Sequence, residues 1–96
     1  MTLNWSKTAN DTALIRTLIP LLEDRMRFEP VEMKWWIKNS QGDWAKAGFY
    51  AYWPVLIEAV GRLPDTEYWA RSKHRVQTSH GARDIAKKLS WKWPTG

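Results

Sequence analysis

The residues whose types and spacing suggest a chemical task are concentrated near the C-terminus of this 96-residue chain. Residues 71–92 carry seven Lys or Arg side chains and one acid, a net charge of +6, whereas residues 1–70 carry eight basic and nine acidic side chains. The formal charge of +5 is therefore local. Cations that meet phosphates and flat rings that stack on bases are the two components of nucleic-acid binding. We therefore expect a surface that binds DNA or RNA with weak sequence preference, because phosphate contacts carry little sequence information. The residues expected to form it are Arg71, Lys73, Arg75, Arg83, Lys87, Lys88, Trp91, Lys92 and Trp93.

The charged and aromatic residues of this C-terminal stretch can also be explained without a ligand. The seven cations could be ordinary solvated surface charges, as most Lys and Arg are. Trp91 and Trp93 could stack on exposed bases, or one of the two rings could fold back over the core. The nucleic-acid interpretation requires that the cations gather on one open face and are not neutralised by acids from the first 70 residues.

A second hypothesis is an adaptor or inhibitor that docks on another protein, such as one that handles nucleic acid. The chain has eight Trp residues, far above ordinary usage, and rings that do not fit the core are favoured at protein interfaces. The expected anchors are Trp36, Tyr50 and Trp53, and the basic stretch would pair with an acidic or phosphate-binding surface of the partner. If Trp35 and Trp36 lie in a strand, they point to opposite faces, so only one of them can enter a one-sided core. In a helix both rings could be largely buried, and burial is the favoured interpretation.

Catalytic and metal-binding patterns are not evident. The chain has no cysteine, so it has no disulfide, thiolate metal site or Cys nucleophile. His74 and His80 would need distant carboxylates to hold a metal, and there is no glycine-rich phosphate loop. The sequence therefore predicts a non-enzymatic protein without a metal or cofactor. The first 22 residues have the pattern of neither a signal peptide nor a membrane span, which predicts a cytoplasmic protein that makes no membrane contact.

The N-terminal part of the chain predicts a helix. Thr8–Asp11 has the spacing of a capping box, and apolar residues from Leu14 to Met26 recur at helical spacing. Pro20 lies inside this pattern, where it removes an amide donor and crowds the carbonyl of Arg16. We therefore expect a kink there, or a break into two short helices.

Three further helices are expected in the second half of the chain. Pro54 can be the first residue of one helix, and Asp65 can cap the next. Thr78 or Ser79 can cap the last helix, whose apolar side chains Ala82, Ile85, Ala86 and Leu89 are spaced to form one stripe.

Residues 31–53 are open to two interpretations. Val31 to Lys38 alternates apolar and polar residues as a strand does, and residues 39–43 give a clear turn signal. Trp44 to Trp53 could pair back as a second strand or form a helix capped by Asp43, and the small residues of its helical face favour the helix slightly. The predicted fold is a mostly α, single-domain bundle of about four helices with proline kinks, spanning residues 1–96. A β-hairpin at 31–53 would make the fold α+β.

Overall fold

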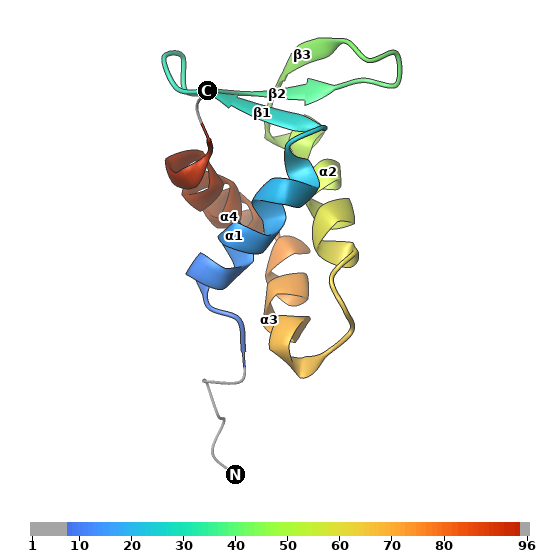
Figure 1. Ribbon diagram of the computed structural model, residues 1–96, viewed down its shortest axis with the longest axis vertical. Coiled ribbons are helices and arrows are strands. Elements are labelled where there is room, and N and C mark those ends of the chain that lie inside the picture. Colours follow the sequence, from blue (N-terminus) through green and yellow to red (C-terminus); the bar gives the residue numbers. More distant parts are fainter. Residues whose placement is uncertain (1–7, 95–96) are drawn as a thin grey trace.

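The computed structural model describes residues 8–94, which form four helices and one three-stranded sheet (Figure 1). In chain order the elements are α1 (Asp11–Leu22), β1 (Met26–Glu29), β2 (Lys34–Lys38), β3 (Trp44–Ala47), α2 (Phe49–Gly61), α3 (Glu67–Val76) and α4 (Ser79–Lys92). The sheet lies at one end of the molecule, over α1, α2 and α4, and α3 lies near the other end (Figure 1). The mostly helical prediction is thus confirmed, in its α+β form.

The core lies between the helices and the inner face of the sheet. Apolar side chains recur on one face of α1 and α4, so each helix can bury a continuous stripe. The largest fully buried side chains are Leu14, Leu18, Leu22, Met26, Leu56, Val60, Val76, Ile85 and Leu89. The four predicted stripe residues of the last helix are all among the buried residues of α4.

The first helix differs from its prediction at both ends. Its N-cap is Asn10, whose side-chain oxygen accepts a hydrogen bond from the Ala13 amide at 2.8 Å, so the predicted capping box at Thr8–Asp11 is wrong. The helix continues through Pro20 to Leu22 without a break. A proline so near the last turn removes only one amide donor, and packing of the apolar stripe outweighs that loss.

The three strands pair in the order β1-β2-β3, and both pairs are antiparallel. The turn at residues 39–43 was predicted correctly: the Asn39 side chain accepts hydrogen bonds from the amides of Gln41 and Asp43, both at 2.9 Å. Gly42 lies in the left-handed region with φ of 86°, which glycine adopts without strain. This turn folds Trp44–Ala47 back as a strand, so the preferred helical interpretation of those four residues is wrong.

Two further elements have unexpected boundaries. Met26 was expected on the apolar stripe of the first helix. It is instead the first residue of β1, where it pairs with Ile37 of β2. Helix α2 begins at Phe49, so Pro54 lies inside it and does not open it. Because Pro54 has no amide hydrogen, the Tyr50 carbonyl lacks its helical donor, and water can replace that donor at this exposed position.

No helix within residues 8–94 combines the length and the apolar character that crossing a bilayer requires.

Candidate nucleic-acid interface

Two of the predicted nucleic-acid contacts are held by acids of the same chain. The Arg75 guanidinium donates to Asp11 at 2.5 Å and to Asp84 at 2.7 Å. The Lys88 ammonium donates to Asp84 at 2.9 Å and also bonds Asp11. We call these four residues the ion-pair network. It joins the start of α1 to the end of α3 and the middle of α4, and it satisfies Arg75 and Lys88 internally.

The other predicted cations lie in separate environments. Lys73 donates to Asp65 at 2.5 Å, and the Arg83 guanidinium lies 4.1 Å from the centre of the Phe49 ring. Lys87 lies 5.6 Å from the centre of the Trp91 ring. Arg71 is exposed on α3, whereas Lys92 is exposed at the end of α4. The condition that acids of the chain leave these cations unneutralised is therefore not met, because Lys73, Arg75 and Lys88 bond carboxylates.

The two C-terminal rings have opposite positions. Trp91 is 63% exposed, whereas Trp93 is 8% exposed and packs edge-on against Trp35 with ring centres 5.1 Å apart. Trp93 is therefore a core residue and is not available to stack on a base.

The ion-pair network makes stability depend on pH in a defined direction. Hydrogen bonds from Lys88 are the largest cause that lowers the pKa of both Asp11 and Asp84, and the bond to Asp11 is the largest cause that raises the pKa of Lys88. A lowered carboxyl pKa stabilises the fold above the unfolded value of about 4 and loses this effect as pH falls through the folded pKa. The raised Lys88 pKa stabilises the fold below about pH 10 and loses its effect as pH rises through the folded pKa. The network therefore contributes throughout the neutral range.

Asp11→Asn is expected to lower the free energy of unfolding at neutral pH, because it weakens the bonds to Arg75 and Lys88. The difference from the original protein should shrink as pH falls below about 4, where the original carboxyl is also protonated. Urea denaturation at a series of pH values measures it. Asp24→Asn, which removes an exposed acid outside the network, is the control. A difference that stays constant down to pH 2 would contradict the assignment.

The three predicted partner anchors differ in exposure. Trp53 is half-buried, and its indole Nε1 donates to the Val76 carbonyl at 2.7 Å, which ties α2 to α3. Tyr50 is 74% exposed and lies beside Phe49 and Trp53 in an aromatic cluster at the start of α2. Trp36 is half-buried on the sheet, on the face opposite Trp35.

Strand alternation gives the sheet a cationic and aromatic outer face. Trp35 enters the core, so Trp36 and Lys38 lie on the other side of β2. Trp36 pairs with Arg27 of β1 and Lys46 of β3, and Lys38 pairs with Trp44. We call the following side chains the outer face of the sheet: Arg27, Glu29, Lys34, Trp36, Lys38, Trp44 and Lys46.

The two tryptophans of the outer face are diagonal neighbours on adjacent strands. In antiparallel sheets such positions are about 7–8 Å apart, within reach of aromatic side chains. Arg27 lies 4.3 Å from the centre of the Trp44 ring, and Lys46 lies 5.7 Å from the centre of the Trp36 ring. Each ring therefore has a cation over one of its faces, and a base would stack on the other face or displace the cation. Among the described cations of this face, only Lys46 forms an ion pair, with Glu32 at 2.8 Å, and both partners are more than half exposed.

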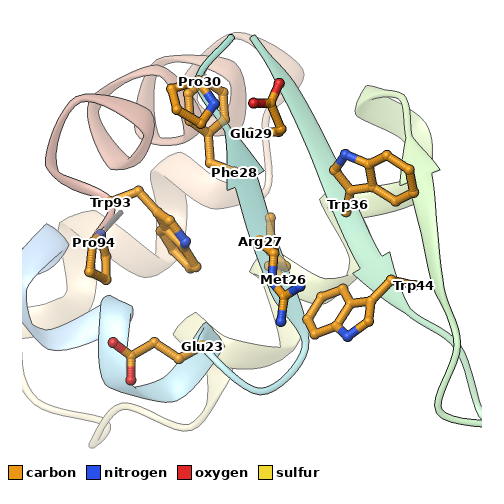
Figure 2. A pocket seen from close by; sticks show the side chains of 10 residues that line it. All are labelled: Glu23, Met26, Arg27, Phe28, Glu29, Pro30, Trp36, Trp44, Trp93 and Pro94. Carbon is orange, nitrogen blue, oxygen red and sulfur yellow. The ribbon is translucent and has the colours of Figure 1, made fainter. Parts of the chain in front are cut away.

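A hollow of about 590 Å³ adjoins the outer face along β1. Figure 2 shows Trp36 and Trp44 on one side of β1 and Trp93 and Pro94 on the other. Arg27 and Glu29 of β1 also line the hollow. The Glu29 carboxylate accepts hydrogen bonds from the amides of Val31, at 3.0 Å, and Glu32, at 2.5 Å, so it is engaged by the turn that follows β1.

Sequence reasoning found one residue of the outer face, Trp36, and missed the others. The alternation of Val31 to Lys38 already indicated that Lys34, Trp36 and Lys38 share a face. Trp44 and Lys46 could be added only once the register of β3 was known.

Comparison with known proteins found no family model, no curated protein and no solved structure that matches the chain.

Proposed function

We propose that this protein is a non-enzymatic, cytoplasmic binding protein that holds single-stranded DNA or RNA on the outer face of its sheet. One observation carries the proposal: Trp36 and Trp44 lie diagonally on adjacent strands, with Lys and Arg side chains around them. The proposal keeps the ligand expected from the sequence and moves its contact from the C-terminal stretch to the sheet.

The aromatic part of this face favours a single strand over a duplex. Each base of a single strand can leave its neighbours and lie flat on a ring, whereas the bases of a duplex are stacked inside it. Stacking on an aromatic side chain contributes about 1–3 kcal/mol per base and tolerates any base. Two rings in diagonal positions suit two bases of one strand.

The charged part of this face supplies phosphate contacts. Arg27, Lys34 and Lys38 form no ion pair among those found within residues 8–94, although Glu29 lies opposite Lys34 in the sheet. Arg75 and Lys88 would each have to give up two bonds to carboxylates first. Arg83, Lys87 and Lys92 of the C-terminal stretch also lie outside these ion pairs, but the exposed ring of that stretch is Trp91, because Trp93 is buried. The sheet places two rings, Trp36 and Trp44, on adjacent strands, and this is the reason for choosing the sheet.

Titration with fluorescently labelled oligothymidylate and oligouridylate tests the proposal. We expect binding that weakens with salt by about 0.7 logarithmic units per logarithmic unit of salt for each phosphate contact, or about 2 units for Arg27, Lys34 and Lys38 together. Trp36→Ala or Trp44→Ala should each cost about 1–3 kcal/mol of binding free energy, because each removes a stacking surface.

Tyr50→Ala and Trp91→Ala remove exposed rings elsewhere on the molecule, so they are the matched controls and should leave the affinity unchanged. Circular dichroism would verify that every variant keeps the fold. Oligonucleotide binding that survives loss of both sheet tryptophans, or that is equally tight for duplex DNA, would contradict the proposal.

A further inference from the structure

A second hollow, of about 440 Å³, lies between α1 and α4, away from the outer face of the sheet. Its apolar lining comes from Ile15 and Ile19 of α1 and from Trp91 of α4. Ile15 is buried and Ile19 is half-buried, whereas Trp91 is 63% exposed. We call this hollow the α1/α4 groove. A large aromatic ring that stays exposed beside two isoleucines forms an apolar surface of the kind that partners cover.

The charges around the α1/α4 groove that are not paired with an opposite charge are positive. Arg16 and Lys92 line it, and Lys87 lies over the Trp91 ring at 5.6 Å. The acid in the groove, Asp11, has both carboxylate oxygens engaged, one by Arg75 and the other by Lys88. Arg16 and Lys92 are exposed and form no ion pair among those found in the described residues. The groove therefore presents unneutralised positive charge on both helices beside an apolar floor.

We propose that the α1/α4 groove binds an acidic amphipathic segment of a protein partner, with apolar side chains against Ile15, Ile19 and Trp91 and carboxylates against Arg16 and Lys92. An amphipathic helix whose apolar face enters a groove between helices is a recurring mode of peptide recognition. This site lies outside the outer face of the sheet, so its partner is additional to the proposed nucleic acid.

Other occupants fit the α1/α4 groove less well. A nucleic acid would meet the rim cations, but its base edges would lose water against two isoleucines without gaining hydrogen bonds. A second copy of this chain brings a net charge of +5 to a positive rim. Residues 1–7 contain Lys7 and no acid, so charge complementarity does not select them.

The test uses the whole protein and three labelled helical peptides of equal length. The first has Leu at i, i+3, i+4 and i+7 with Glu at the other positions. The second keeps the Leu pattern and replaces Glu by Lys, and the third scrambles the acidic sequence. We expect the acidic amphipathic peptide to bind, measured by fluorescence anisotropy, and the other two to bind at least about tenfold more weakly.

Substitutions in the α1/α4 groove test whether the acidic peptide binds there. Trp91→Ala should weaken binding of the acidic peptide about tenfold or more, since exposed tryptophans are frequent interface hot spots. The double variant Arg16→Gln, Lys92→Gln should weaken binding of the acidic peptide about fivefold and reduce the salt dependence of that binding. Lys34→Gln, Lys38→Gln makes the same change in net charge on the sheet, so it should leave peptide binding unchanged.

Three kinds of result would overturn the inference. The first is peptide binding without the expected selectivity, shown either by equal binding of the Lys peptide or by no effect of Trp91→Ala. The second is oligothymidylate binding that is lost in Trp91→Ala and kept in Trp36→Ala, which would make the groove a nucleic-acid site. The third is self-association that Trp91→Ala abolishes, which would mean that a second copy covers the groove.

Discussion

Trp35→Ala is expected to lower the free energy of unfolding by about 3–5 kcal/mol, the usual cost of removing a buried aromatic side chain. Trp35 is 7% exposed, and its ring centre lies 5.0 Å from that of Phe28, 5.1 Å from that of Trp93 and 5.9 Å from that of Tyr52. The loss affects β1, β2, α2 and the end of α4 together, because these rings come from all four. A domain of this size is stable by about 5–14 kcal/mol, so the expected loss is a large share of the total.

The neighbouring Trp36→Ala is the matched control, because it removes the same side chain from the opposite face of the same strand. Its expected cost is below about 1 kcal/mol, because Trp36 lies outside the buried core. Urea denaturation followed by circular dichroism measures both variants. If the two variants lost equal stability, the assignment of Trp35 to the core and Trp36 to the outer face would be wrong.

Gly81→Ala is expected to destabilise the protein by about 2–3 kcal/mol or more, because the added methyl group has no room at the junction of α3 and α4. A Cβ atom at this position would lie 2.2 Å from the Arg75 carbonyl oxygen and 2.8 Å from the Thr78 hydroxyl oxygen. Thr78 caps α4 by accepting from the Gly81 amide at 3.0 Å and donates to the Arg75 carbonyl, also at 3.0 Å. The methyl group therefore forces apart the atoms that set the turn between the two helices.

Gly61→Ala provides the comparison, since a Cβ atom at Gly61 meets no atom within 4 Å and the residue lies at the end of helix α2. Alanine has the higher helix propensity, so Gly61→Ala should be neutral or should stabilise the fold by up to about 1 kcal/mol. Thermal unfolding of the two variants separates a steric effect from a general loss of glycine. A Gly81→Ala variant as stable as the original protein would show that the junction has more room than the structure gives it.

Features set by nearby residues were predictable from the sequence. The turn at 39–43 depends on the side chain of Asn39 and the backbone freedom of Gly42, and both lie within the turn itself. Thr78 was one of two residues expected to cap the last helix, and it does. The opposite positions of Trp35 and Trp36 follow from strand alternation alone. In each of these cases the physical cause acts over a few residues.

Features that depend on distant residues were not predictable. Met26 fits the helical spacing of residues 14–26, yet pairing with Ile37 makes it part of a strand. The charge count of residues 71–92 could not reveal that Asp11, 64 residues before Arg75, would neutralise Arg75 and Lys88. Trp44 and Lys46 were missed for the same reason, because their place on the outer face depends on the register between β2 and β3.

The ion-pair network also has a consequence for the order in which the chain assembles. Its bonds from Asp11 span 64 and 77 residues, and bringing such distant segments together costs more chain entropy than closing a hairpin or a helical corner. Local units such as β2 with β3 and α3 with α4 can therefore form first. The hydrogen bonds to Asp11 then form late in folding. They therefore slow unfolding more than they accelerate folding.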